Sequence, residues 1–243
     1  EVSRVNQADR EFSWTSRRAP PSAREALLRL AVALNLPASQ VRLAREQSRS
    51  GSDLVDAALY PIPSWIPSDG LKLDRAVLYA VMRQESNFIQ HAQSHAGARG
   101  VMQLMPGTAS FIARDRSLLS SKRRKLFDPE FNMSLGQKYL IYLLEKETTA
   151  ENMFLVAIAY NAGPGNLARW LRTIDHGDDW LLFIESLTKR ETRNYVERVM
   201  ANLWAYRSRL GQATPTLDSI AKGFWPRFTS LEGFPIVDST AGQ

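Results

Sequence analysis

Residues 73–113, LDRAVLYAVMRQESNFIQHAQSHAGARGVMQLMPGTASFIA, contain the pattern that decides the fold. Asp74 is a residue type that caps helix starts, and Leu78 and Met82 follow at helical spacing. We therefore expect a helix that begins near Asp74 and carries Glu85 on its apolar side. A carboxylate there resists ionisation, because desolvation and the negative end of the helix dipole both disfavour its charge. Glu85 is thus a candidate general acid, although a glutamate in a last helical turn is more often simply solvated.

The sequence after Glu85 changes to a glycine-containing loop. Glycine permits positive φ and lets a ligand approach the backbone closely. Between Gly100 and Gly107, Met102 and Met105 offer adaptable apolar surface and Gln103 offers an amide. The pattern describes an acid beside a potential binding loop. It fits a tight connection between two core helices equally well, and these residues alone leave both interpretations open.

Several segments together resemble the motifs of soluble lytic murein transglycosylases, relatives of goose-type lysozyme. In chain order they are Glu85-Ser86, then Ser94 with GARGVMQLMP at 97–106, AYNAGPG at 159–165 and ETRNYV at 191–196. An isolated Glu-Ser pair or GxxG would be weak, but all of these motifs in the expected order are specific. The resemblance covers roughly residues 73–210 and does not reach the first fifty residues.

The resemblance implies an all-α, lysozyme-like fold with a cleft between helical lobes. Independently, no convincing strand alternation occurs in the sequence. The family cleaves the MurNAc–GlcNAc β-1,4 bond of peptidoglycan without hydrolysis and leaves 1,6-anhydro-MurNAc ends. Its single glutamate serves as acid and then as base, with help from the N-acetyl group of the substrate. That chemistry suits a sequence in which no second acid stands out near Glu85.

Family positions transfer residue by residue onto this sequence. Glu85 matches the catalytic acid. The positions that match substrate-binding residues are Ser94, Gly100, Met102, Gln103, Met105, Tyr160, Asn161, Glu191 and Tyr195. As bare patterns, Tyr160 at a helix end would be an interface anchor and Glu191 a capping charge, so the resemblance alone assigns them to the cleft.

Two other functions stay open on the sequence. The nearer is a lysozyme-type hydrolase on the same scaffold, in which water intercepts the intermediate. The further is a non-catalytic cell-wall-binding module, whose hallmark would be a lost acid, and Glu85 is present. The mass of the released product separates the first from a transglycosylase.

Composition limits the classes of partner and cofactor. The chain has 243 residues, 44% of them hydrophobic, with no cysteine and a net charge of +6. Neither a thiolate metal site nor a disulfide is possible, and the three histidines lack zinc-site spacing, so we expect no metal and no cofactor. The positive charge favours an anionic partner. Nucleic acid and peptidoglycan, whose stem peptides carry carboxylates, both fit this charge, so charge alone does not choose between them. Because the basic residues are dispersed and no groove-reading motif appears, we expect no nucleic acid partner.

The beginning of the chain indicates a processed or excised protein. It starts at Glu1 without an initiator methionine, and its first twenty residues lack the apolar core of a signal peptide. No apolar run reaches transmembrane length. The resemblance implies a bacterial periplasmic location, with peptidoglycan strands as substrate and cell-wall or secretion-system proteins as possible partners.

The expected domain plan has four parts. Residues 1–21 form a poorly ordered lead-in, and 22–57 form a short helical segment that opens with a capping box, Ser22 to Glu25. By analogy with the family, this segment is the end of an upstream helical array. The catalytic domain covers 58–210, and 211–243 form an irregular tail packed on it.

Inside the domain we expect three further long helices. Residues 130–146 are apolar over a wide arc and should form a central buried helix. Residues 150–162 form a small-residue helix, which Gly163 ends and Pro164 prevents from resuming. The last long helix covers 191–210. Trp170 and Trp180 are predicted to be core residues rather than sugar-stacking platforms.

Residues 114–125 are rich in Lys and Arg and form a basic connection after the central stretch. If this surface attracts the anionic wall polymer, replacing Lys122 to Lys125 with neutral residues should flatten the salt dependence of binding to sacculi, because salt screens exposed charges. Sedimentation of the protein with sacculi at increasing salt measures this dependence. An unchanged salt profile would contradict the prediction.

Overall fold

A computed structural model describes residues 11–48, 52–177 and 179–234. Over these residues every named element is a helix, and extended pairing is limited to isolated bridges, so the predicted all-α fold class is confirmed. The chain divides into two compact units. The first runs to Trp65 and includes Asn87–Ile89, and the second comprises Ile66–Ser86 and the chain from Gln90 onward.

The first unit is a small helical cluster. Its helices are α2 (Arg24–Ala33), α3 (Pro37–Glu46) and α4 (Asp53–Leu59), which pack on one another. Their apolar sides share a core that includes Leu28, Leu43 and Val55. Helix α4 was not predicted from the sequence; Ser52 caps its start by accepting a hydrogen bond from the Val55 N–H.

Three expectations for the first unit need correction. The capping box at Ser22 does not form, because residues 21–23 make a 3-10 turn and α2 begins at Arg24 without a side-chain cap. Residues 11–18, expected to be poorly ordered, are helical, and Phe12 packs on the core of the unit. Residues 1–10 lie outside the described residues.

The boundary of the unit also lies later than residue 58. The Asn35 side chain donates to the Ile62 carbonyl at 3.1 Å and accepts from the Ser64 N–H at 3.0 Å. These two bonds attach the proline-rich segment to the first unit. The boundary therefore follows Trp65.

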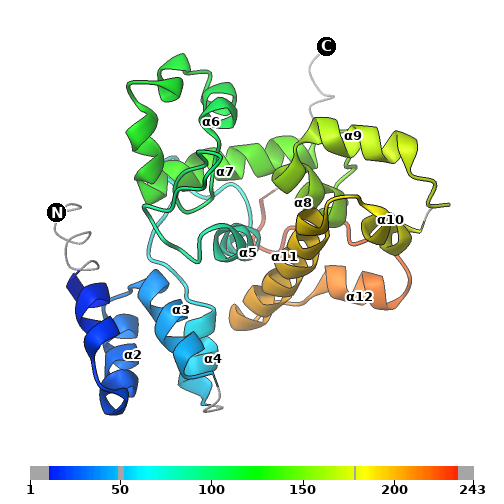
Figure 1. The fold of residues 1–243 in the computed structure, drawn as a ribbon. Helices are drawn as coiled ribbons and strands as arrows, with labels where there is room; N and C mark the ends of the chain where they lie inside the picture. The colour runs from blue at the N-terminus through cyan, green and yellow to red at the C-terminus, as the bar shows by residue number, and fades with distance from the viewer. Residues whose placement is uncertain (1–10, 49–51, 178, 235–243) are drawn as a thin grey trace. The chain divides into compact units, whose positions relative to one another are not determined.

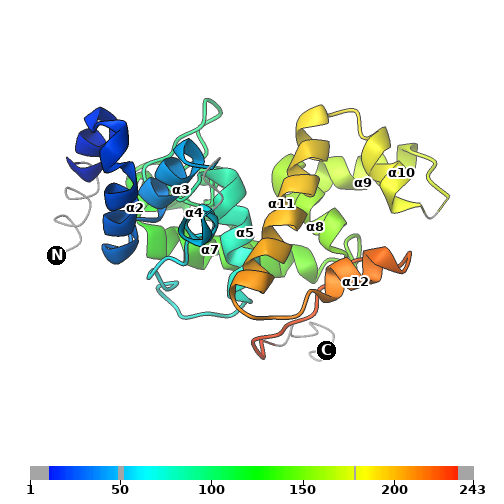
Figure 2. The same cartoon turned by 90° about the horizontal axis from the view of Figure 1, so that it is seen from below.

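The second unit contains the remaining helices (Figures 1 and 2). They are α5 (Arg75–Glu85), α6 (Pro106–Ala113), η2 (Arg116–Leu119), η3 (Arg123–Phe127), α7 (Pro129–Leu144), α8 (Met153–Ala162), α9 (Pro164–Thr173), α10 (Trp180–Ser186), α11 (Arg190–Arg209) and α12 (Pro215–Ala221). Helix α5 packs on α7 and most extensively on α11, and α8 packs on both α7 and α11. The two views agree that α5 and α11 lie side by side.

Helix α5 is one of the most buried elements of this unit. Every residue from Ala76 to Met82 is buried, so the helix is covered on all sides and not only along one stripe. Helix α7, predicted as the central buried helix, is also buried over most of its length. Polar residues return only in the last turn of α5, before Glu85.

The end of α8 differs from the prediction. Gly163, with φ of 87°, ends α8 as expected, but Pro164 begins α9 instead of preventing further helix. Proline is well tolerated at a first helical position, where its missing N–H would have no partner in the helix. Trp170 in α9 is only 3% exposed, which agrees with its predicted place in the core.

The chain after α11 contains a helix and a return segment rather than an entirely irregular tail. After α12, residues 224–234 run back across the unit, where the Pro226 carbonyl accepts from the Met153 N–H and the Glu151 carbonyl accepts from the Phe228 N–H. Within the described residues, no helix combines the length and apolar character needed to cross a bilayer.

The side chain of Asn132, in α7, holds the loop between α5 and α6 through hydrogen bonds to its backbone. This side chain accepts from the Met102 N–H at 2.8 Å and donates to the carbonyls of Arg99 and Leu126 at 3.0 and 2.9 Å. Gly100 lies directly against this side chain, so that a Cβ atom there would overlap it. Glycine is thus required at position 100 because the loop backbone packs closely against Asn132 and the Leu126 carbonyl.

Asn132→Ala should destabilise the protein by about 3 kcal/mol, because it leaves the Met102 N–H and the Leu126 carbonyl without a partner and removes one of the two hydrogen bonds of the Arg99 carbonyl. Urea unfolding at neutral pH measures this change. Asn166→Ala is the matched control, since within the described residues the Asn166 side chain accepts only from Arg169 and donates only to the nearby Ala162 carbonyl, four residues before it. Equal losses in the two variants would contradict the assigned role of Asn132.

Candidate active site

Glu85 is the last residue of α5, and its carboxyl meets a hydroxyl from α11. The Tyr195 hydroxyl donates a hydrogen bond to Glu85 Oε1 at 2.6 Å. The next residue, Ser86, ends the helix and donates to the Val101 carbonyl at 2.7 Å. The end of α5 is therefore fastened both to α11 and to the glycine-containing loop.

The surroundings of Glu85 favour its protonated form. Burial raises the pKa of Glu85 to about 7, the hydrogen bond from Tyr195 lowers it, and the charge of Glu191 raises it. A carboxyl with a pKa near the working pH can give up a proton and take one back at low cost. The side chain nonetheless keeps partial exposure, which a group that contacts a ligand requires.

Two tyrosines, from α11 and α8, lie near this carboxyl, and a third, from α7, lies next to one of them. Tyr195 is buried, and the Tyr160 hydroxyl from α8 donates to the Met102 carbonyl at 2.9 Å. Burial, then the charge of Glu85, raises the pKa of both phenols well above the usual value. The Tyr139 ring of α7 lies 5.3 Å from that of Tyr160. All three phenols therefore remain neutral at the working pH.

Tyr139 is a member of this group that the sequence did not identify. Its position in an apolar run placed it in the core, and it is only 8% exposed. Burial raises its pKa to about 12. Tyr142 follows Tyr139 by three residues on the same helix, and the centroids of their stacked rings lie 6.2 Å apart. This pair of tyrosines at helical spacing was the sequence signal that could have identified Tyr139.

The predicted residues of the loop mostly brace the loop itself. Gln103 has a left-handed φ of 47°, and its side-chain amide donates to the Ala92 and Gly100 carbonyls at 3.0 and 2.8 Å. The Ser94 hydroxyl accepts from the Ala98 N–H at 3.0 Å. These bonds fix the path of the backbone beside Glu85.

The two predicted methionines differ in exposure. Met102 is fully buried, so its side chain presents no surface to a ligand, although its carbonyl holds Tyr160. Met105 is 42% exposed at the start of α6. Of the two, only Met105 offers the apolar surface that the sequence predicts for both.

Asn161 and Glu191 belong to the junction of α8 and α11. The Asn161 side chain accepts a hydrogen bond from the Thr192 hydroxyl at 2.8 Å, which ties the end of α8 to the start of α11. Glu191 is exposed in the first turn of α11 and acts on Glu85 through its charge. Thr192 lies inside the ETRNYV motif, but no role was predicted for it from the sequence.

The structure thus brings Tyr195, Tyr160 and Glu191 into the surroundings of Glu85, and it places Ser94, Gly100, Met102 and Gln103 in the braced loop. Their contacts with a substrate stay predictions. In the parts of the chain that the structure describes, no group of three or more His, Asp and Glu side chains is placed to hold a metal ion. The arrangement can donate and accept one proton at one carboxyl.

Comparison with known proteins gives a family for this arrangement. The family profile described as Transglycosylase SLT domain matches residues 67–183. A soluble lytic murein transglycosylase of Escherichia coli K12 is 36% identical over 161 residues, which are 66% of this chain and 24% of that protein. A membrane-bound lytic murein transglycosylase C of Salmonella arizonae is 30% identical in an alignment 156 positions long that covers 56% of this chain and 43% of that protein.

Solved structures agree with the sequence comparison. The 70 kDa soluble lytic transglycosylase of Escherichia coli superposes with a TM-score of 0.70 at 28% identity, over 85% of this chain and 34% of that one. An inactive mutant of the lytic transglycosylase Slt from Pseudomonas aeruginosa gives a TM-score of 0.63 at 28% identity, over 87% of this chain and 34% of that one. The chain aligns with about a quarter of the length of the soluble curated relative.

The pKa of Glu85 predicts a pH-dependent stability. The folded protein keeps the proton up to about pH 7, whereas the unfolded chain releases it near the ordinary value of 4.5. The free energy of unfolding should therefore fall as pH rises through this interval, by about 3 kcal/mol, and then stay level. Glu85→Gln removes the ionisable group, so the variant should exceed the parent by about that amount at pH 8.

Urea unfolding at pH 4.5 and pH 8 measures this difference. The advantage of Glu85→Gln should shrink at pH 4.5, where the parent carboxyl is neutral. Glu197→Gln, which neutralises an exposed glutamate of α11, is the control and should follow the parent at both pH values. An advantage of Glu85→Gln that is the same at both pH values would show that the carboxyl titrates normally.

Proposed function

Because residues 67–183 belong to the transglycosylase SLT domain family and the chain is a homologue of lytic murein transglycosylases, we propose that this protein cleaves peptidoglycan strands without hydrolysis. The bond cut is the β-1,4 bond between MurNAc and GlcNAc. The product is a strand that ends in 1,6-anhydro-MurNAc. No cofactor takes part in this chemistry.

One observation carries the proposal: the Glu85 carboxyl lies against the Tyr195 hydroxyl at 2.6 Å and has a pKa of about 7. A general acid must hold a proton at the working pH and release it in the transition state. An ordinary exposed glutamate is ionised at neutral pH and could not serve. The solved Pseudomonas relative supports the choice, since its inactive mutant has glutamine in place of a glutamate.

The first step of the proposed reaction breaks the glycosidic bond. Glu85 gives its proton to the oxygen that leaves with the GlcNAc residue. The carbonyl oxygen of the MurNAc N-acetyl group bonds to the anomeric carbon and takes the place of a protein nucleophile. Common glycosidases need a second carboxylate for this task. Glu191, exposed and charged near Glu85, serves instead to favour retention of the proton before cleavage.

The second step closes the anhydro ring. The now ionised Glu85 removes the proton of the C6 hydroxyl, and that oxygen displaces the N-acetyl oxygen from the anomeric carbon. Glu85 ends the cycle protonated, and no water is consumed. The hydrogen bond from Tyr195 stabilises the ionised form between the two steps, which keeps the carboxyl able to act as a base.

The remaining predicted residues would position the glycan. Ser94, Gly100 and Gln103 shape the loop beside Glu85, Met105 offers apolar surface, and Met102 acts through its carbonyl on Tyr160. Asn161 and Glu191 line the junction of α8 and α11. A strand of sugars that passes between the loop and this junction would lie across Glu85.

The proposed setting is the bacterial periplasm, where the wall polymer is found. The net charge of +6 suits a polymer with carboxylates. Cell-wall or secretion-system proteins are the partners proposed for the chain, and nucleic acid is not. The activity of the full-length relatives is carried over to this chain only as part of this proposal.

Glu85→Gln should reduce the release of muropeptides from purified sacculi at least about a hundredfold, because it removes the only proton donor of the proposed cycle. Circular dichroism and the unfolding midpoint check that the fold is intact. Glu197→Gln is again the matched control and should retain activity. Substantial turnover by the Glu85→Gln variant would exclude Glu85 as the catalytic acid.

Mass spectrometry of the released muropeptides identifies the reaction. Anhydro products are lighter by one water than the hydrolysed products of a lysozyme. Products at the hydrated mass would favour the lysozyme-type hydrolase on the same scaffold. Binding to sacculi without any release would favour the non-catalytic wall-binding alternative.

A further inference from the structure

Helices α5 and α11 are joined by polar contacts at both ends. At one end the Tyr195 hydroxyl donates to Glu85, and at the other Arg207 Nη1 lies 2.8 Å from Asp74 Oδ2. The start of α5 thus meets the end of α11, and the two helices run antiparallel. A rise of 1.5 Å per residue gives about 16 Å from Asp74 to Glu85 and about 18 Å from Tyr195 to Arg207. The two contacts, Glu85–Tyr195 and Asp74–Arg207, are therefore separated by nearly the same length on each helix, and we call them the anchor points.

Contacts between these anchor points keep the same register. The Asn202 side chain donates to the Ala80 carbonyl at 3.3 Å. The Tyr79 and Tyr206 rings meet edge to face at 5.5 Å. Each pair joins a residue of α5 to one of α11 in antiparallel order. A shift of one helix along the other would therefore break the contacts at all levels together.

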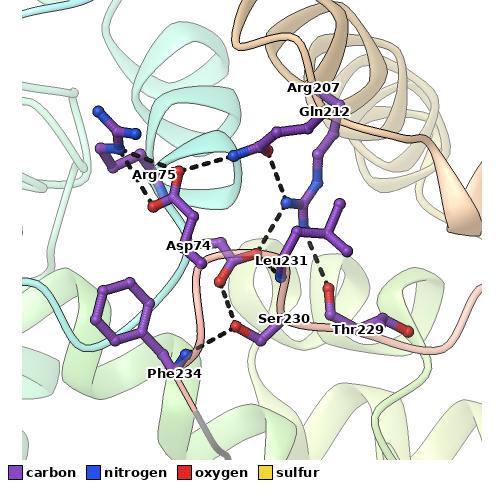
Figure 3. A network of polar contacts seen from close by, with 9 residues as sticks. Asp74, Arg75, Arg207, Gln212, Thr229, Ser230, Leu231 and Phe234 are labelled. Carbon is purple, nitrogen blue, oxygen red and sulfur yellow. Dashed lines mark hydrogen bonds and ion pairs between the residues drawn. The ribbon is translucent and has the colours of Figure 1, made fainter.

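The far anchor is a buried ion pair that the C-terminal segment completes (Figure 3). The Arg207 side chain is 4% exposed and that of Asp74 is 0% exposed. Asp74 does not cap α5 with its side chain. Its carboxylate instead accepts from the Ser230 hydroxyl at 2.6 Å and from the Leu231 N–H at 2.7 Å.

A second carboxylate, Glu232, supplies the cap that Asp74 does not. Glu232 accepts from the Arg75 N–H at 3.1 Å, at the first residue of α5, and pairs with the Arg75 guanidinium. Gln212 links the two halves of the network, because it donates to Glu232 and accepts from Arg207, each at 2.8 Å. The Thr229 carbonyl accepts the remaining guanidinium bond of Arg207, as Figure 3 shows.

The network fixes geometry more than it adds stability. Removing two charges from water costs several kcal/mol, so a buried ion pair is retained only when further hydrogen bonds satisfy both groups. Here the C-terminal segment provides those bonds. Side chains fixed in this way allow one arrangement of α5 against α11. The same two helices bring Glu85 and Tyr195 together.

We propose that Asp74, Arg75, Arg207, Gln212 and residues 229–232 form a C-terminal clamp that sets the register of α5 on α11 and thereby holds the Tyr195 hydroxyl on Glu85. The inference rests on the proposed function, since it makes Arg207 and Glu232 positioning residues for the acid. They act through the helices and touch no substrate. The segment after α12 is thus a working part of the active site.

A double-mutant cycle tests the clamp. Glu232→Ala and Tyr195→Phe are compared alone and together, by the rate of muropeptide release and by the urea midpoint at pH 8. Effects of changes more than about 10 Å apart normally add, so coupling between these two positions would reveal a connection through the helices. Glu232→Ala should lower the rate about tenfold in the parent and less than about twofold when Tyr195 is already Phe.

Asp69→Ala is the matched control for this cycle. Asp69 also holds several donors, from Lys72, Lys138 and Gln137, but it ties the segment before α5 to α7 and not to α11. Its effect on rate should be the same with Tyr195 or Phe at that position. Independent effects of Glu232→Ala and Tyr195→Phe, or equal coupling for Asp69→Ala, would overturn the clamp.

The urea midpoints distinguish a failure of the clamp from a failure of the proposed transglycosylase function. If the parent releases no muropeptides, the proposed function fails, and non-additive urea midpoints for Glu232→Ala and Tyr195→Phe still decide the clamp. If the parent is active and the midpoints and rates are additive, only the clamp fails. Should Glu232→Ala not fold, Gln212→Ala removes only the link between Arg207 and Glu232 and is read in the same way.

Discussion

The structure depends on keeping one carboxyl largely out of water at the end of a helix that is buried on all sides. Helix α5 has no exposed face between Ala76 and Met82, so the position of Glu85 is set by the helices packed around it. Tyr195 and Tyr160 come from two of those helices, and a phenol carries no positive charge that could pair with the carboxylate. Burial therefore dominates, and the single hydrogen bond from Tyr195 only moderates it. This balance between burial and one hydrogen bond is the reason for proposing that Glu85 acts first as an acid and then as a base.

The burial that raises the pKa of Glu85 also lowers the stability of the folded protein when Glu85 is ionised. An ionised Glu85 in partly apolar surroundings is a cost that the fold carries above about pH 7. Two buried polar networks set the geometry of the unit around this carboxyl. Asn132 holds the loop from α7, and the ion pair of Asp74 and Arg207 holds the two long helices. Both networks are remote from the proton itself. Their effect is to leave the carboxyl few alternative positions.

Local patterns predicted the parts of this arrangement that lie within one helix. Spacing of apolar residues gave α5, α7 and α11 and placed Glu85 at a helix end, and the family motifs named Tyr160 and Tyr195. Contacts between distant segments were not predictable. Asp74 looks like a helix cap, but its carboxylate binds Arg207, and the cap comes from Glu232, 157 residues after Arg75. Tyr139 looks like a core residue because its neighbours are apolar, and Pro164 looks like a helix stop because the sequence does not show that a helix begins there.

The central claim is that Glu85 holds its proton near neutral pH while it remains within reach of a glycan. The most direct measurement is the titration of its carboxyl carbon by NMR in protein labelled at glutamate, with Glu85→Gln used to assign the resonance. We predict a midpoint near pH 7, as burial beside Tyr195 requires. A midpoint near the ordinary value of 4.5 would mean that the carboxyl is freely solvated, and it would contradict this claim.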